Sequence, residues 1–245
     1  MKRFIPLLRC FANSYGMKKI VLILFTIHHS LFTIAQDANA LIANAKAKLD
    51  KVNDYTATGV LKTDIVFIKA PVSNVKVYYK KPDHFRLVKN GGVSVLPKGG
   101  ISVNMNNVIS TNNFTALDAG EAVINNVKTK VIRLLPNDDT SNIVLSTLYI
   151  DETNFLIRKT TTTTRENGTY ELMMTYGKYA DYGLPDKVQF SFNAKDYKLP
   201  KGVTLDFDET SKPSDTDQLK NKKGKVEITY SSYVINKGVD DSVFK

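Results

Sequence analysis

The feature that most constrains the fold is a series of β-prone segments between Leu148 and Asn193, separated by short turn-forming stretches. The dipeptide Asn167-Gly168 stands between two of these segments and can supply the two positive φ angles of a type I′ hairpin turn. Apolar and polar residues then alternate, which gathers the apolar side chains on one face of each strand. The series predicts an antiparallel sheet with one buried face, shared by Tyr170, Leu172, Met174, Val188, Phe190 and Phe192.

The predicted turn also sets the register of this hairpin. If Asn167 and Gly168 form a two-residue turn, Glu166 faces Thr169. The next pairs along the ladder are then Thr163 with Leu172, Thr161 with Met174, and Lys159 with Tyr176. In this register Leu172 and Met174 face inward, Glu171 and Met173 face outward, and the small threonines leave room on the inner side.

Residues 1–36 have the features of an export signal. A basic start at Met17-Lys18-Lys19 precedes a mostly apolar run from Ile20 to Ile34, and small residues precede Gln36. The run is short for a membrane span, which takes roughly 20 residues. We interpret residues 1–36 as a signal peptide, with Met17 as an alternative start, and residues 37–245 as a single exported domain.

The composition suits an exported domain of ordinary charge. Removal of residues 1–36 lowers the formal net charge from +10 to +5, because five basic residues and no acidic residue leave with them. The single cysteine, Cys10, leaves as well, so disulfides do not stabilise the exported domain. A domain of 209 residues can bury a core unaided. Its mild basicity suits a protein near anionic lipid, and equally an ordinary soluble domain.

An amphipathic helix is expected at residues 37–53. Asp37 can cap its N-terminus, because a carboxylate accepts hydrogen bonds from the first free backbone N–H groups. Apolar residues recur at helical spacing, which predicts a narrow stripe made of Leu41, Ala45, Leu49 and Val52. Such a helix would plug or cover one open end of a sheet.

From Tyr55 onward the chain reads as strands bounded by Pro, Gly, Asn and Asp. No helical segment of crossover length separates them, which favours one curved antiparallel sheet over βαβ units. A short helix or a turn is expected near residues 113–122, and loops at 91–100 and 209–224. Eleven strands are expected, at residues 55–68, 74–80, 84–89, 101–105, 129–135, 144–150, 156–165, 169–179, 187–193, 203–208 and 225–235.

The residues that most enzyme sites need are scarce. The exported domain keeps one histidine, His84, and no cysteine, so a Cys/His zinc site cannot be assembled. A Ser-His-Asp triad would need His84 as its base and has no Gly-x-Ser-x-Gly elbow. The acid pairs Asp138-Asp139 and Asp240-Asp241 lack EF-hand spacing, and no pair of acids stands out as that of a glycosidase. We therefore expect no catalysis, no metal and no cofactor.

The feature that does point to a function is the large amount of apolar side-chain area. The chain has 12 Tyr and 12 Phe, and one curved sheet with one helix does not obviously fill its own concave side. A cavity on that side would shelter an acyl chain, whose burial contributes about 0.8 kcal/mol per methylene. The residues predicted to line it and to bind lipid are Leu41, Leu49, Leu148, Ile150, Leu172, Met174, Phe190 and Phe192.

Five segments along the chain stand out together: the N-terminal helix, YYKKPDHFRL (78–87), LYIDETNFLIRK (148–159), TYELMMTYGKYADYGLP (169–185) and INKGVDDSVF (235–244). In these segments the sequence resembles the outer-membrane lipoprotein carrier (LolA-like) superfamily. The resemblance implies an unclosed β-barrel of about eleven strands, covered by helices, that holds acyl groups without catalysis. The family's short elements correspond to Lys81, Pro82, Phe85 and Arg86, to Ile150-Asp151 before Leu156-Ile157, and to Leu184-Pro185.

These features predict a mainly β half-barrel with an N-terminal amphipathic helix as lid or plug, and a monomeric carrier in the periplasm, which can associate with the outer membrane. Its expected partners are lipid or lipoprotein acyl chains and envelope membrane proteins. Basic and aromatic residues interleave in 76–86, but export argues against nucleic acid as a partner. The alternative is an envelope sensor or protein-interaction domain of the same fold, whose sheet edge or 91–100 loop binds a protein. A hydrolase ranks third.

Overall fold

The computed structural model describes residues 37–64, 72–82, 84–89, 113–166, 168–193 and 223–244, all within one compact unit, Asp37–Lys245. The proposed signal peptide lies outside these residues, as do the predicted strands at 101–105 and 203–208. The predicted loop at 91–100 and most of that at 209–224 also lie outside them.

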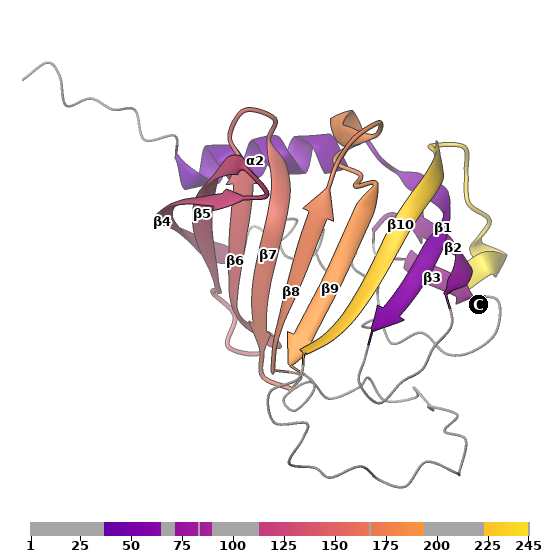
Figure 1. Cartoon of the computed structure of the whole chain (residues 1–245). Helices are drawn as coiled ribbons and strands as arrows, with labels where there is room; N and C mark the ends of the chain where they lie inside the picture. Colours follow the sequence, from indigo (N-terminus) through magenta and orange to yellow (C-terminus); the bar gives the residue numbers. More distant parts are fainter. Residues whose placement is uncertain are drawn as a thin grey trace, which may run out of the picture. The chain divides into compact units, whose positions relative to one another are not determined.

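The described residues form one ten-stranded antiparallel sheet and one α-helix (Figure 1). The strand order is β3-β2-β1-β10-β9-β8-β7-β6-β5-β4. The elements are α2 (Ala38–Leu49), β1 (Asp54–Asp64), β2 (Ser73–Lys80), β3 (His84–Lys89), β4 (Phe114–Ile124), β5 (Val127–Pro136), β6 (Ile143–Asp151), β7 (Leu156–Thr164), β8 (Gly168–Thr175), β9 (Lys187–Asn193) and β10 (Lys223–Ile235), with short 3-10 helices η1 (Ala180–Tyr182) and η3 (Asp241–Phe244). The predicted mainly β half-barrel with an N-terminal helix is confirmed.

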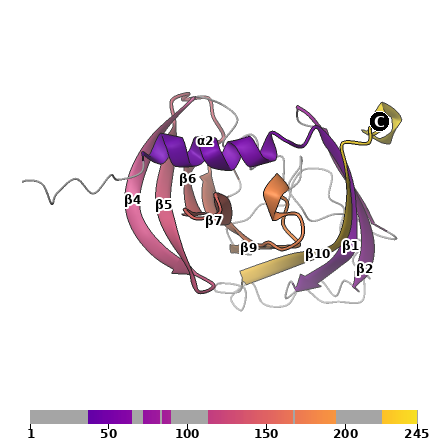
Figure 2. The ribbon, with the colours of Figure 1, turned by 90° about the horizontal axis from the view of Figure 1, so that it is seen from above.

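The sheet is strongly curved (Figure 2), and its two edge strands, β3 and β4, do not pair with each other. Seen from above, α2 crosses the open side of this curve (Figure 2). The helix lies at the end of the strands where β6 turns into β7 and where η1 follows β8 (Figure 1). We call the side of the sheet that faces α2 the inner face.

The predicted N-terminal helix forms, and its predicted cap is present. The Asp37 side chain accepts a hydrogen bond from the Asn39 backbone N–H at 3.0 Å. The helix ends at Leu49, four residues before the predicted end. Val52 therefore does not belong to its apolar stripe, although it is buried among the residues that follow the helix.

The predicted two-residue turn between β7 and β8 is wrong. Thr164 pairs with Gly168, whose φ is 70°, so three residues separate the paired positions. Arg165 leaves the ladder and bonds to the neighbouring β5–β6 connection instead. Its backbone N–H donates to Asn142 O at 2.9 Å and its Nε donates to Ser141 O at 3.0 Å. These tertiary bonds favour the longer loop.

The longer loop changes which threonines share a face with Leu172. Leu172 pairs with Thr160 rather than Thr163, and Lys159 pairs with Met173 rather than Tyr176. The predicted pairs of Thr161 with Met174 and Glu166 with Thr169 are likewise absent from this ladder. Thr160, Thr162 and Thr164 are consequently the buried threonines of β7.

Residues 113–122 were predicted as a short helix or turn, but all of them except Asn113 belong to strand β4. The strand returns into β5 through Asn125 and Asn126, whose φ angles are 48° and 63°. Asparagine tolerates this left-handed region, so the pair builds the tight turn that Asn-Gly would otherwise supply. A bulge between Asp118 and Glu121, where Gly120 has φ 89°, interrupts the alternation that would have revealed the strand.

A second bulge turns two tyrosines toward the inner face. Thr58 pairs with Ser232 and Gly59 with Tyr230, so Ser231 is the extra residue of β10. Tyr230 and Tyr233 therefore share a face although they are three residues apart. A Cβ at Gly59 would lie 2.5 Å from Thr229 O, which is backbone and cannot rotate away.

We expect Gly59→Ala to destabilise the protein by about 2 kcal/mol, as overpacking against a fixed neighbour does. Urea unfolding followed by circular dichroism measures this change. Val60→Ala is the matched control, because Val60 is exposed, and it should change stability by less than about 0.5 kcal/mol. Equal effects of the two substitutions would contradict the described packing of β1 against β10.

Candidate functional site

The inner face carries one large apolar cluster, and all eight predicted cavity residues are part of it or pack against it. Leu49 is half-buried and packs against the cluster from the end of α2. The other seven have exposed fractions of 3% or less: Leu41, Leu148, Ile150, Leu172, Met174, Phe190 and Phe192. The structure thus brings together side chains from α2, β6, β8 and β9.

The cluster also contains residues that the sequence analysis did not select. Ile132 and Leu134 come from β5, Leu61 from β1, and Val226 and Ile228 from β10. In β10 the signal was available, because Val226 and Ile228 alternate with polar residues, whereas in β5 the apolar neighbours Val131 and Leu135 obscure it. The cluster therefore includes more strands than predicted and extends across the sheet from β1 to β5.

The outward face of β8 also agrees with the prediction. Glu171 forms an ion pair with Lys159, with 2.7 Å between Oε1 and Nζ. Met173 is only partly exposed, because the Asn125 side chain from the β4–β5 turn lies 3.6 Å from its sulfur. The tip of that hairpin thus explains the apolar residue on the outer face.

Hydroxyl groups interrupt the apolar inner face along β7. The hydroxyls of Ser146 and Thr162 lie 2.7 Å apart and are buried. Burial raises the pKa of the Tyr170 hydroxyl, and its hydrogen bond with Thr162 opposes this rise. The three hydroxyl groups form hydrogen bonds with one another, so they are compatible with an otherwise apolar interior.

A tyrosine cluster closes the inner side near the end of α2. The Tyr233 ring lies 5.3 Å from that of Tyr55, 4.9 Å from that of Tyr179 and 5.0 Å from that of Tyr230. The Tyr233 hydroxyl donates to Pro185 O at 2.8 Å. Burial raises the pKa of Tyr233 and Tyr230 well above the ordinary value for a phenol. The cluster is thus a structural anchor rather than a source of protons.

The C-terminal end of α2 is tied down by polar bonds. Lys81 Nζ donates to Asp50 O at 2.8 Å, and Lys51 Nζ donates to Asp181 O at 3.2 Å. The Asn236 side chain accepts from Asn53 N at 2.7 Å and donates to Lys51 O at 2.8 Å. Along its length the helix rests on the inner face through its buried side chains, Ala38, Leu41 and Ala45.

The β6–β7 turn is organised by Asp151, which is buried. Its Oδ1 accepts from the backbone N–H groups of Thr153 and Asn154, at 3.0 and 3.1 Å. Its Oδ2 accepts from Arg158 at 2.7 Å and from the Asn154 amide at 3.0 Å. Burial alone would raise the pKa of Asp151, but these hydrogen bonds outweigh it and hold the pKa below its ordinary value.

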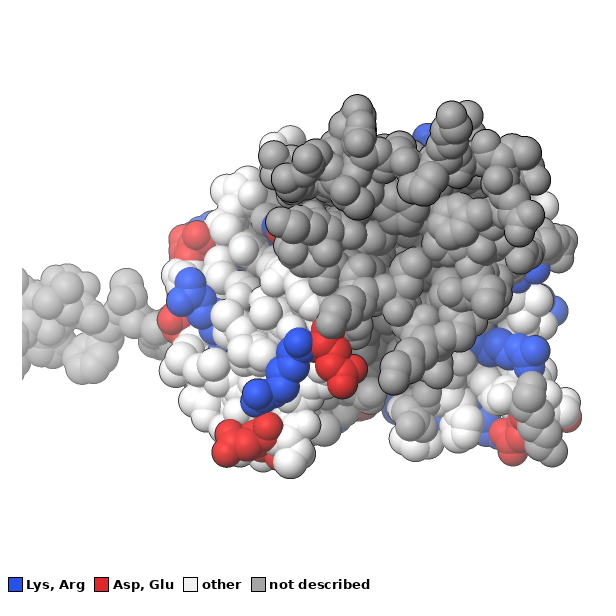
Figure 3. All heavy atoms as spheres, turned by 90° about the horizontal axis from the view of Figure 1, so that it is seen from below, with Lys and Arg blue, Asp and Glu red and all other residues white. Residues whose placement is uncertain are grey.

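The remaining polar groups give little sign of a reaction site. The His84 ring lies 5.3 Å from the ring of Phe244, which belongs to the 3-10 helix η3. Within the described ranges, no three His, Cys, Asp or Glu side chains gather as a metal site requires, and no helix is long and apolar enough to cross a membrane. Seen from below, the described surface carries single basic and acidic residues among uncharged ones (Figure 3).

Comparison with known proteins places the fold. No protein-family model matches the sequence, and no curated protein matches it significantly. Among solved structures, a DUF1329 family protein from Desulfovibrio piger is similar at 12% identity and TM-score 0.52, covering 85% of this chain and 97% of that one. A LolA superfamily protein from Nitrosomonas europaea is similar at 9% identity and TM-score 0.50, with the same coverage. At these identities the likeness is one of fold.

Truncation of the inner and outer residues of β8 should have unequal effects. We expect Leu172→Ala to cost about 3 kcal/mol, because it leaves a cavity in the cluster. Met173→Ala, on the outer face, should cost less than about 1 kcal/mol. Urea unfolding of both variants measures the asymmetry, and a larger loss for Met173→Ala would contradict the assigned faces.

Asp151→Asn should reduce stability in a way that depends on pH. Because the folded-state pKa of Asp151 is lowered, its carboxylate stabilises the fold above the ordinary aspartate pKa of about 4, and this stability is lost as pH falls through the folded-state pKa. The deficit of the variant should be about 2 kcal/mol at neutral pH and shrink toward pH 3. Urea titrations at several pH values test this. Asp139→Asn, in the exposed β5–β6 connection, is the control and should show little deficit at any pH.

Proposed function

We propose, on the premise that this chain has the fold of the LolA superfamily, that it is a carrier that shelters the acyl chains of a lipid or lipoprotein. The chains would lie between the inner face of the sheet and α2. The observation that carries the proposal is the convergence of all eight predicted lining residues on one apolar cluster beneath a single helix.

The attachment of α2 supports this proposal. Polar bonds hold its C-terminal end, whereas apolar side chains along the helix hold it against the inner face. Apolar contacts are not directional, so an acyl chain can replace the helix side chains at little cost. In the unliganded protein these side chains cover the inner face, and ligand binding requires that they move.

The polar groups near the inner face favour binding over catalysis. Asp151 and Arg158 are paired with each other, and Ser146 and Thr162 bond to each other. A nucleophile needs an adjacent base that is free to take its proton, and these pairs do not supply one. We therefore propose that the protein binds its ligand without chemical change.

The proposed location is the periplasm. It rests on the features of residues 1–36, which match an exported precursor, and on the fold that this chain shares with a LolA superfamily protein. A location beside the outer membrane would bring the carrier to lipoproteins and lipids that need shelter from water.

The dependence of affinity on chain length tests acyl binding without any mutation. Each buried methylene contributes about 0.8 kcal/mol, so lengthening a saturated fatty acid from 12 to 14 carbons should tighten binding roughly tenfold. Displacement of a fluorescent fatty acid from the delipidated mature domain measures this. Native mass spectrometry of the protein purified from cells should show bound lipid. Absence of bound lipid together with affinities independent of chain length would overturn the proposal.

Paired substitutions locate the ligand. Leu172→Asp places a charge on the inner face and should abolish binding, whereas Met173→Asp, on the outer face, should leave it within about twofold. Circular dichroism confirms that each variant is folded before binding is measured. Equal loss in both variants would contradict the inner face as the binding surface.

A second candidate function is docking of an envelope protein on the β4 edge of the sheet. Among the described strands, β4 pairs on one side only, with β5, and it carries the exposed residues Leu117 and Val123. An edge of this kind can accept a further strand from a partner. A stable protein partner recovered from envelope extract, with no lipid bound, would favour this function over the carrier.

A further inference from the structure

Arg158 holds a buried polar atom without a partner. Its Nε is shielded from solvent and makes no hydrogen bond, and no other buried side-chain nitrogen or oxygen of the described residues shares this property. A buried donor of a charged group is costly to leave unpaired, so such a group calls for an explanation. The carrier function as described so far does not use it.

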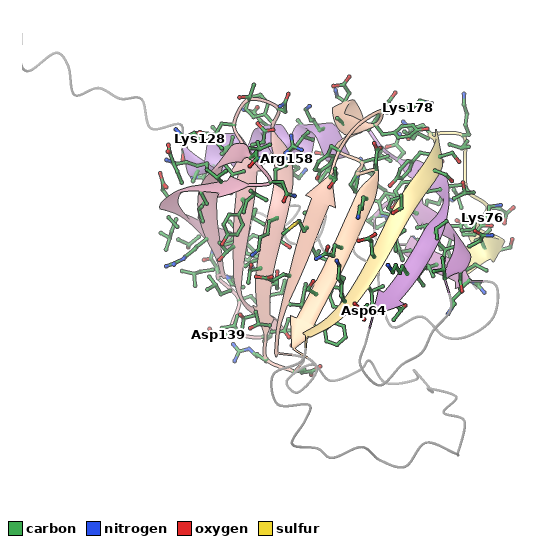
Figure 4. All side chains as sticks on the ribbon, in the orientation of Figure 1. Asp64, Lys76, Lys128, Asp139, Arg158 and Lys178 are labelled. Carbon is green, nitrogen blue, oxygen red and sulfur yellow. The ribbon has the colours of Figure 1, made fainter. Side chains whose placement is uncertain are left out.

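The unpaired donor lies beside the inner-face cluster. The Arg158 guanidinium carbon is 5.5 Å from the centre of the Tyr176 ring. The Tyr176 hydroxyl donates to Ile157 O at 2.8 Å and lies 3.6 Å from the sulfur of Met174. Ile157 and Met174 both belong to the cluster, and Tyr176 packs against it. Arg158 itself lies toward the end of the sheet that α2 covers (Figure 4).

The charge of Arg158 is already balanced. Its NH2 group donates to Asp151 Oδ2 at 2.7 Å, and the Asp151 side chain is 3% exposed. A ligand carboxylate or phosphate at Nε would add a second negative charge close to Asp151, in apolar surroundings that disfavour it. A neutral acceptor has no such cost, and a hydrogen bond from a charged donor is stronger than one between neutral groups. The geometry therefore favours a carbonyl over an anion.

The β6–β7 turn, which precedes Arg158, also contains a strained backbone conformation. Phe155 has φ 53°, a region that bulky residues rarely adopt, and its partly buried side chain packs against the cluster. Strained residues gather at ligand-binding positions because the surrounding structure must hold them. Here the hydrogen bonds of Asp151 to Thr153 and Asn154 hold the turn.

From these observations we propose that Arg158 is a specificity residue, whose Nε–H donates to the ester carbonyl of an acyl ligand. The acyl chain attached to that carbonyl would extend along the apolar cluster. The protein would then select esterified chains, such as those of a diacylglyceryl group or a phospholipid, over ether-linked chains. This inference rests on the proposed acyl-chain binding.

A comparison of two phospholipids tests the inference on the wild-type protein. Dimyristoyl phosphatidylcholine and its di-O-tetradecyl ether analogue have the same headgroup and nearly equal chains, and differ in the carbonyls. Each is presented below its critical micelle concentration as a competitor of a bound fluorescent fatty acid. A hydrogen bond to a charged donor predicts about tenfold tighter binding of the ester.

Arg158→Lys is the variant that separates recognition from structure. Lysine keeps the positive charge for Asp151 but lacks the guanidinium fork that offers a second donor in a fixed direction. The ester preference should fall from about tenfold to about twofold, with unfolding stability close to that of the wild type. Lys159→Gln is the matched control: Lys159 is the next residue and pairs with Glu171 on the outer face, so the preference should be unchanged.

The outcomes distinguish this inference from the carrier function. Equal affinity of the wild type for ester and ether, with clear binding of both, would overturn the role of Arg158 and leave the carrier function standing. An ester preference that survives in Arg158→Lys would also overturn it. Failure of both lipids and of the fatty acid to bind would instead overturn the carrier function itself.

Discussion

The structure depends on covering the apolar inner face of a sheet that does not close. A closed barrel would bury its interior through its own strands, but here β3 and β4 remain unpaired with each other, so another element must exclude water from the inner face. The 12-residue helix α2 and the tyrosine cluster do this. Under the proposed carrier function, a cover made of one short helix is what allows the same face to exchange side-chain contacts for an acyl chain.

The segments in which the sequence resembles the LolA-like superfamily act mainly at the turns. Lys81 binds the end of α2, and the Pro185 carbonyl accepts a hydrogen bond from the Tyr233 hydroxyl. Asp151 organises the β6–β7 turn, and Asn236 joins the C-terminal segment to the start of β1. These bonds hold the connections at the ends of the strands in place. A fold specified in this way tolerates wide variation of the apolar residues, in keeping with identities of 12% and 9% to solved structures of the same fold.

The prediction of which side chains face inward succeeded where the prediction of register failed. Leu172 and Met174 face inward under either register, because alternation within one strand sets the face. Which residues of β7 pair with β8 depends on the length of the loop between these two strands. Arg165 sets this length through bonds to the β5–β6 connection. Strand β4 was missed because a bulge at Gly120 and exposure at the sheet edge remove the alternation that marks a strand.

The amino-acid sequence by itself determined the mainly β class, the capped N-terminal helix and the eight apolar residues of the inner face, because these follow from local periodicity and from the side chain of Asp37. Tertiary structure alone decided that Thr160 and Thr162 face inward, that Ser231 is an extra residue that turns Tyr230 and Tyr233 to one side, and that Arg158 keeps an unpaired Nε beside Tyr176. Each of these depends on contacts between segments far apart in the chain, whose geometry no local pattern of residues encodes.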